Sequence, residues 1–270
     1  MRNRRRRLTM WRHGVALALG LLVGLTWTVS PVFADCQELP NHTELRAALR
    51  QVVQAGNNGG LGNDMWATLV DREGVVCVVA VTGPDNSAWP GSRVIAAQKA
   101  NTANAFSRPE GVRGFAAPLS TANLYDAVQP GGSLFGLQFS NPVDPAVAYR
   151  GDPATYGRAN DPMVGGKIGG INVFGGGLAL YTAAGALVGG VGVSGDTSCT
   201  DHIIAWKVRF TLNLDNVPGG VSATGDDNMI FPPAEGLQAA FTHPRCTPVG
   251  APATAIARNL PTTHPVGPNP

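Results

Sequence analysis

The chain has 270 residues, of which 44% are hydrophobic and 14% are charged, a composition typical of one or two globular domains. Six of its 20 basic residues and none of its 18 acidic residues precede Asp35, which leaves the rest of the chain with a net charge of −4. Because this part is mildly acidic and contains no basic tract, we exclude a nucleic-acid-binding protein.

The first 34 residues have the pattern of a signal peptide. Arginines crowd the first 12 positions, an apolar stretch runs from Val15 to Val29, and Ala34 offers a small residue for cleavage. We therefore expect cleavage near Ala34 and a periplasmic or secreted protein. An uncleaved anchor is the alternative, and the arginine run leaves both the general secretory and the twin-arginine export routes open.

Four cysteines follow the leader, and outside the cytosol an even number suggests disulfides. Their positions are too scattered for a structural zinc site. Three pairings are possible, and we expect Cys36–Cys77 and Cys199–Cys246. These bonds would tie both ends of the domain to its core.

The first structural elements predicted after the leader are a helix and a β-hairpin. Residues 45–53 place apolar side chains at helical spacing, and the pattern stops at Gly56. Two β-rich runs, 66–70 and 75–81, are joined by a turn in which Gly74 supplies the positive φ.

A second helix is predicted from about Ser92 to Ser107, and the proline after Arg108 ends it. Lys99 and Thr102 share one face of this helix. A lysine there either extends its charge to the rim or faces a bound anion. In the same way, Thr102 either bonds the backbone one turn back or contacts a ligand, and Arg108 either caps the helix or pairs with an anion.

The region from Gly111 to Gly170 is rich in turn-forming residues. Within it, two tyrosines and two arginines could form a lid over a ligand, or the segment could be an ordered surface loop. These four residues are Tyr149, Arg150, Tyr156 and Arg158.

Residues 175–197 predict a second hairpin with a turn at Ala184–Gly185, and residues 201–214 predict the last helix, capped by Thr197 or Ser198. The tail, 247–270, is rich in Pro, Ala and Thr, and we expect it to be disordered or to lie along the surface.

Three segments in order, 66–76, 92–109 and 175–197, resemble the signature of the GlcG/HbpS-like heme-binding family, the DUF336-type domain. With the residues between them, the resemblance extends from about Leu45 to Trp206. It implies a domain over residues 35–246. Relative to compact members, residues of about 142–167 look like an insertion and residues 247–270 like an extension.

The alternation of helices with antiparallel hairpins predicts an α+β fold, a single antiparallel sheet with helices packed on one face. The family resemblance implies the same architecture, a heme or related tetrapyrrole as cofactor, and a homo-oligomer.

The resemblance also suggests that heme lies against the second helix and the turn after the second hairpin. The expected ligand-binding residues are Lys99, Thr102, Arg108, Ser194, Gly195, Asp196 and Thr197. Heme iron usually takes His, Met, Cys or Tyr as an axial ligand. The histidines after Asp35 are His42, His202, His243 and His264, and we expect His202 to be the ligand, with Tyr181 and Met65 as weaker candidates.

Two other motifs carry little weight. Residues 190–195 match Gly-x-Gly-x-x-Gly, but a dinucleotide site needs a parallel βαβ unit, and this strand is predicted to pair in a hairpin. The serine at 194 lacks the second glycine of a nucleophile elbow. No nucleophile, base and orienting residue can be assembled from the sequence.

The sequence therefore predicts an exported heme-binding protein that stores, scavenges or senses heme. A heme-degrading or other small-molecule enzyme on the same site is one alternative. A ligand-free adaptor for a membrane sensor protein is another.

Overall fold

The computed structural model describes residues 35–84, 88–109, 118–246 and 251–267, and the predicted leader lies outside these ranges. The elements of this part are as follows: η1 (Cys36–Glu38), α1 (His42–Gln54), β1 (Trp66–Asp71), β2 (Val76–Val81), α2 (Gly91–Phe106), η2 (Thr121–Leu124), η3 (Asp126–Val128), α3 (Pro145–Ala148), η4 (Pro153–Thr155), β3 (Gly177–Tyr181), β4 (Leu187–Ser194), α4 (Ser198–Thr211), η5 (Gly236–Phe241) and α5 (Ala251–Thr263).

The four strands form one antiparallel sheet in the order β2-β1-β4-β3. Both predicted hairpins are present, β1 with β2 and β3 with β4, and the two hairpins meet where β1 pairs with β4. The α+β class and the single antiparallel sheet predicted from the sequence are therefore confirmed.

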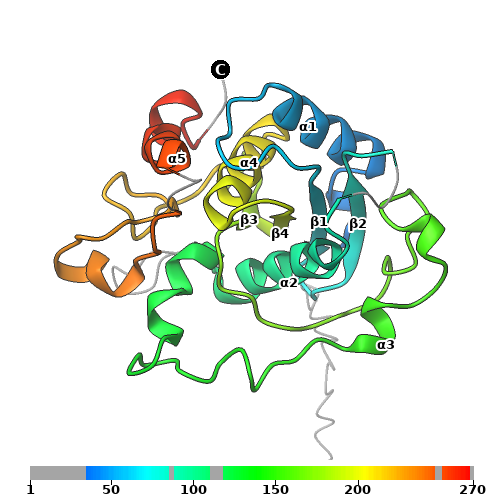
Figure 1. Ribbon diagram of the computed structural model, residues 1–270, viewed down its shortest axis with the longest axis horizontal. Helices are drawn as coiled ribbons and strands as arrows, with labels where there is room; N and C mark the ends of the chain where they lie inside the picture. Colours follow the sequence, from blue (N-terminus) through cyan, green and yellow to red (C-terminus); the bar gives the residue numbers. More distant parts are fainter. Residues whose placement is uncertain (1–34, 85–87, 110–117, 247–250, 268–270) are drawn as a thin grey trace, which may run out of the picture. The chain divides into compact units, whose positions relative to one another are not determined.

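Helices cover both faces of the sheet rather than one, which corrects the prediction. Figure 1 shows α2 on one side of the strands and α1 and α4 on the other. The central strand β1 explains this arrangement, because all six of its residues are buried. Ala67 and Leu69 belong to the core shared with α1 and α4, whereas Trp66 and Val70 belong to the core shared with α2.

The glycines of β4 let α2 lie directly on the sheet. A Cβ atom on Gly190 would lie 2.4 Å from the carbonyl oxygen of Ala100, and one on Gly192 would lie 1.9 Å from that of Ala96. Both distances are shorter than any real Cβ contact, so only glycine permits this helix–strand spacing. The glycine-rich signature thus serves backbone packing at these two positions.

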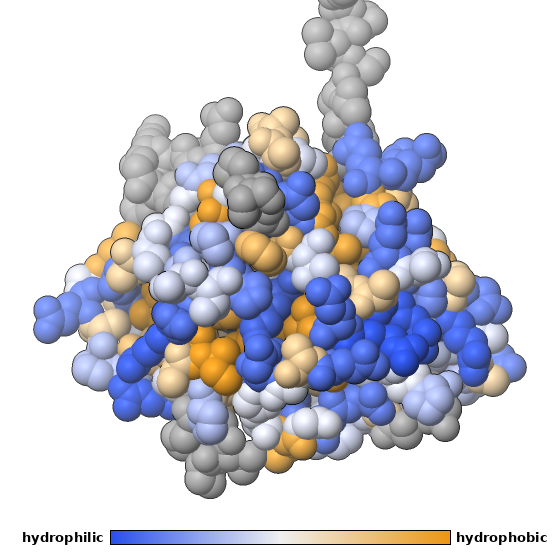
Figure 2. All heavy atoms as spheres, turned by 90° about the horizontal axis from the view of Figure 1, so that it is seen from above, coloured by the Kyte–Doolittle hydropathy of each residue, from blue (hydrophilic) through white to orange (hydrophobic). Residues whose placement is uncertain are grey.

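Helix α1 begins with a complete capping box. The side chain of Asn41 accepts hydrogen bonds from the backbone at Thr43 and Glu44, and the Glu44 side chain accepts one from the Asn41 amide. The helix buries its apolar face and leaves its polar face to solvent. In Figure 2, hydrophilic side chains gather on the side on which α1 lies in Figure 1.

The predicted insertion is an ordered surface segment that adds to the edge of the sheet. The amide of Val76 donates to Gly166 O at 2.9 Å, and the amide of Gly165 donates back to Val76 O at 2.8 Å. A buried ion pair between Arg93 of α2 and Asp161 of the segment also joins the segment to α2. This anchoring favours the ordered loop over the mobile lid.

The described part of the C-terminal tail, 251–267, contains a helix that packs on α4, whereas we expected disorder or a segment along the surface. Ala253, Ala257 and Leu260 recur at helical spacing on α5, and all three are buried in the same core cluster as α4. The indole of Trp206 also donates to His264 O at 2.8 Å. Because prolines and threonines interrupt this short apolar stripe, the helix was not predicted from the sequence.

Two disulfides, Cys36–Cys77 and Cys199–Cys246, join the cysteines in the pairing that the sequence analysis expected. The first ties the segment before α1 to β2, and the second ties α4 to the segment before α5. None of the helices in the described ranges combines the length and hydropathy that crossing a bilayer requires.

Candidate functional site

Lys99, the first residue of the predicted heme set, is buried and fully engaged by the chain. Its Nζ donates to Asp201 Oδ2 at 2.7 Å and to Val193 O at 3.1 Å. The ammonium thus joins α2 to the start of α4 beside the end of β4. Burial lowers the pKa of Lys99 and raises that of Asp201 to about 6, and the contact between the two groups opposes both shifts.

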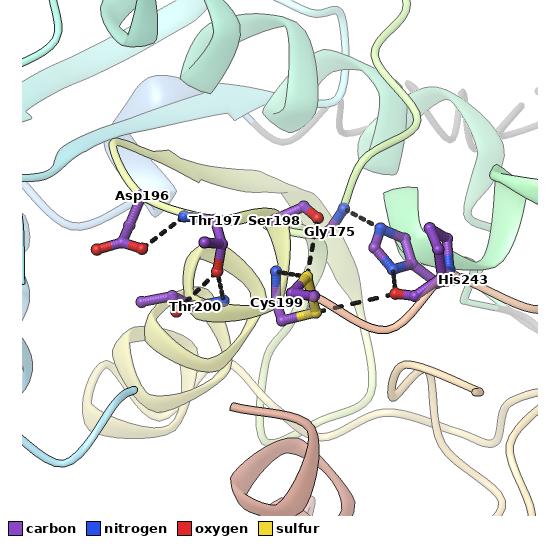
Figure 3. Close-up of a disulfide and its surroundings, with 9 residues drawn as sticks. Gly175, Asp196, Thr197, Ser198, Cys199, Thr200 and His243 are labelled. Carbon is purple, nitrogen blue, oxygen red and sulfur yellow. Dashed lines mark hydrogen bonds between the residues drawn. A yellow bond between two sulfur atoms is a disulfide. The ribbon is translucent and has the colours of Figure 1, made fainter. Parts of the chain in front are cut away.

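The turn between β4 and α4 is organised by Asp196. Its carboxylate accepts backbone hydrogen bonds from the three consecutive residues Leu61, Gly62 and Asn63 at 2.8 to 3.4 Å. It also accepts one from the amide of Thr197 at 2.6 Å (Figure 3). Asp196 therefore fastens the 61–63 loop to the N-terminus of α4.

The neighbouring residues of that turn have structural contacts as well. Thr197 caps α4, because its side chain accepts a hydrogen bond from the amide of Thr200 (Figure 3). Gly195 packs against Met65, and its carbonyl accepts from the side chain of Asn63 at 2.9 Å. Ser194 is buried and pairs with Trp66 in the sheet.

Thr102 bonds the backbone one turn back, as the simpler of the two interpretations expected. Its hydroxyl donates to Gln98 O at 2.7 Å and accepts from the amide of Asn172 at 3.0 Å. Arg108 is exposed, and its carbonyl accepts from the hydroxyl of buried Tyr181 at 2.6 Å. Arg108 is therefore the one member of the expected set with a solvent-exposed charge.

The structure thus brings most of the predicted residues together, but their side chains are buried and bind other parts of the chain. The side-chain polar atoms of Lys99, Thr102 and Asp196 all form hydrogen bonds within the chain, and all three residues are buried. As arranged here, these three residues do not fit heme, because they leave no free group for the propionates or the iron.

His202, the predicted iron ligand, is completely buried on α4. Neither ring nitrogen makes a hydrogen bond with any residue in the described ranges, although Asn228 is close. The Asn228 side chain is used by Ala257 O and by the amide of Met229. Burial, reinforced by His243, lowers the pKa of His202 to about 3.

The second buried histidine, His243, has both nitrogens in use. Its Nδ1 donates to Pro244 O at 2.7 Å, and its Nε2 accepts from the amide of Gly175 at 3.4 Å (Figure 3). Burial lowers the pKa of His243 to about 4. Both buried histidines are therefore neutral at physiological pH.

This burial predicts an acid-labile domain. As pH falls below 6.5, His202 protonates in the unfolded chain but stays neutral in the folded one, so the free energy of unfolding decreases until about pH 3. We expect His202→Phe to remove up to about 3 kcal/mol of the loss between pH 6.5 and pH 4. Urea unfolding of both proteins at pH 7.5 and pH 4.5 measures this, and equal slopes against pH would contradict it.

The geometry excludes two other kinds of site, a dinucleotide site and a metal site with thiolate ligands. Strand β4 is antiparallel to both of its neighbours, so the Gly190–Gly195 motif has no βαβ unit and does not form a dinucleotide site. Cys36, Asp71 and Cys77 form the one cluster of three potential metal ligands found in the described residues. The disulfide occupies both sulfur atoms, so this cluster has no thiolate for a metal.

An open site lies elsewhere, where α1 meets the insertion. Two cavities of about 430 and 530 Å³ share His42, Arg158 and Ala159 in their walls. The larger one, which we call the His42 cavity, is also lined by Arg46 and Tyr156. Neither His42 nor Arg46 is among the ligand-binding residues predicted from the sequence. The Asn41–Glu44 capping pattern marks the start of α1 and so places both residues one turn apart, but nothing in the sequence places Arg158 beside them.

The sheet, the glycine contact with α2 and the Lys99 junction with α4 define an α+β domain held together by backbone packing and buried ion pairs. The model of the HbpS-like family, described as haem degrading protein HbpS-like, matches residues 41–208. The chain belongs to this family. No curated protein shows a significant match.

Several solved structures are similar to the chain. A structure of PduOC in complex with heme is 26% identical, covers 65% of this chain and 96% of its own, and has a TM-score of 0.43. Klebsiella pneumoniae protein ORFY is 23% identical over 63% of this chain and 86% of its own, with a TM-score of 0.41. A double mutant of Streptomyces reticuli HbpS is 18% identical over 74% and 99%, with a TM-score of 0.39.

Proposed function

We propose that the chain is an extracytoplasmic protein that binds heme or a closely related tetrapyrrole. Membership of the HbpS-like family over residues 41–208 carries this proposal. The two disulfides support an extracytoplasmic location, because the cytosol keeps most thiols reduced. Reversible binding would suit storage or scavenging. Redox sensing, a homo-oligomer and a membrane sensor as partner stay predictions.

Within this proposal, the residues predicted from the sequence hold the framework. Lys99 and Asp196 connect α2, the 61–63 loop and the start of α4, and Thr102 fixes the segment at Asn172. Their substitution would therefore alter folding before it altered heme affinity. Only Arg108, which is exposed, is open to a direct contact.

A hemin titration of the purified protein with its disulfides intact tests the proposal. We expect a saturable change in the Soret band at one heme per chain, because a built site holds the porphyrin in a single environment. The same titration in 6 M urea is the control for nonspecific association. A broad, non-saturating change that is equal in both conditions would reject heme binding and favour the ligand-free adaptor.

Heme degradation is a second candidate function, favoured by the description of the family model. Oxidative breakdown driven by peroxide at a bound heme requires no nucleophile from the protein. It is tested by adding peroxide to the heme complex and following the loss of the Soret band, the appearance of bilin-like products and the release of iron. Free hemin under the same conditions is the reference.

A further inference from the structure

The His42 cavity has the size and lining of a ligand site. Its volume of about 530 Å³ lies within the range of small-molecule sites, roughly 300 to 1,000 Å³. Apolar residues line part of it, among them Val81, Pro84 and Ala154. The described lining residues include two arginines and a histidine but no carboxylate, although the chain after the leader carries a net charge of −4. The cavity therefore suits an anionic ligand with an apolar body.

His42 is held in the way that metal-binding histidines usually are. Its Nε2 lies 2.9 Å from Gly157 O. A carbonyl oxygen can only accept, so Nε2 carries the proton and Nδ1 keeps a free lone pair. Metal-ligating histidines almost always give their other N–H to a carbonyl or carboxylate, which fixes the ring. Nδ1 of His42 makes no hydrogen bond within the described part of the chain.

A buried network holds the carbonyl that orients His42. The guanidinium of Arg93 binds both carboxylate oxygens of Asp161, and both side chains are almost completely buried. Asp161 Oδ2 also accepts from the amide of Gly157 at 2.7 Å. Gly157 itself has a φ of +73°, and a Cβ there would lie 2.6 Å from a methyl group of Val81. The peptide that positions the imidazole is therefore fixed from the core outward.

The arginines beside His42, Arg46 and Arg158, are each held by a hydrogen bond from Nε and keep their terminal nitrogens free of contacts with the described residues. Arg46 Nε donates to Val81 O at 3.1 Å, and Arg158 Nε donates to Ala154 O at 2.8 Å. The terminal nitrogens of both arginines make no hydrogen bond or ion pair with the described residues. A guanidinium with two free N–H groups on one edge binds a carboxylate in a bidentate manner.

We infer that heme binds in the His42 cavity, with the iron on His42 Nδ1 and the propionates on Arg46 and Arg158. The inference rests on the proposed function and names its site. The donor set supplies one imidazole lone pair and two cations, which matches the iron and the two carboxylates of heme. The insertion, through Gly157 and Arg158, provides the second wall of this site.

The iron ligand is tested by titrating hemin into the wild-type protein, His42→Ala and His264→Ala. His264 is the matched control, because it is also half-buried and lies beside a cation, Lys207, in a different cavity. We expect His42→Ala to weaken binding at least tenfold and to lose the histidine-ligated spectrum. Added imidazole should restore that spectrum, and His264→Ala should behave like the wild type.

The propionate contacts are tested with hemin and its dimethyl ester. We expect Arg46→Gln and Arg158→Gln each to weaken hemin binding about tenfold, a typical loss for one charge-assisted contact. Neither change should affect binding of the ester. Arg50→Gln is the control, because Arg50 is exposed on α1 one turn further along.

The hemin titrations distinguish a wrong site from a wrong function. If wild-type, His42→Ala and both arginine variants all bind hemin with the same affinity and spectrum, the His42 cavity is not the site, while the proposed function stands. If the wild-type protein binds no hemin in a saturable manner, both the function and the site are rejected.

Discussion

Replacing Lys99 by methionine is expected to destabilise the domain by about 3–5 kcal/mol, the usual cost of removing one partner of a buried ion pair. Asp201 would then keep a buried carboxylate with only the amide of Asp196 as a partner, at 2.9 Å. A loss of this size lowers the Tm of a domain this large by roughly 10 °C. Thermal unfolding followed by circular dichroism measures it.

The double variant Lys99→Met/Asp201→Asn separates a lost ion pair from lost packing. Because it removes the unpaired charge, it should recover more than half of the stability that Lys99→Met loses. If Lys99→Met unfolds at the wild-type temperature, the ammonium does not hold α2 and α4 together. Lys99 would then be free for the ligand role that the sequence suggested.

Gly192→Ala is expected to have the second large effect, a loss of about 3 kcal/mol. The new methyl group would lie 1.9 Å from Ala96 O, a backbone atom that cannot move without shifting α2. Because α2 and β4 share the main contact between helix and sheet, the change should also reduce the cooperativity of unfolding.

Gly91→Ala is the matched control for that prediction. Gly91 is the first residue of α2, and a Cβ there would meet no atom within 4 Å. Alanine should be neutral or slightly stabilising at this position, since it has the higher helix propensity. Equal effects of the two alanines in urea unfolding would show that β4 tolerates side chains and that its glycines serve another purpose.

The periodicity of the chain was sufficient to predict most of the fold. The Gly74 turn and the Ala184–Gly185 turn each lie between two β-prone runs, and both form hairpins as expected. The helices at 92–107 and 201–214 were placed within three residues of α2 and α4 at each end. Turn residues and helical periodicity depend only on neighbouring residues, so a single sequence is enough to predict them.

Long-range arrangement was harder to predict, because it depends on contacts between distant segments. The sequence indicated that Lys99 shares an apolar face, but not that Asp201, 102 residues later, would meet it. It also did not show that β1 would be covered on both faces. The helix α5 was missed because its apolar stripe is only three residues long.

The candidate site shows the same limit. His42 and Arg46 can be placed together from the capping box at the start of α1, but their significance depends on Gly157 and Arg158, which arrive from the insertion. The family resemblance directed attention to α2 and to the turn before α4. In this structure those residues hold α2, α4 and the 61–63 loop together. The two arginines with free terminal nitrogens lie elsewhere, Arg46 on α1 and Arg158 in the insertion.

The position of bound heme can be seen directly in a crystal structure of the hemin-loaded protein, with an anomalous difference map at the iron edge. We expect one iron peak per chain at bonding distance from His42 Nδ1, with the propionates at Arg46 and Arg158. An iron peak at His202, or between α2 and the start of α4, would contradict the assigned site. The absence of any ordered iron in crystals grown with excess hemin would contradict heme binding itself.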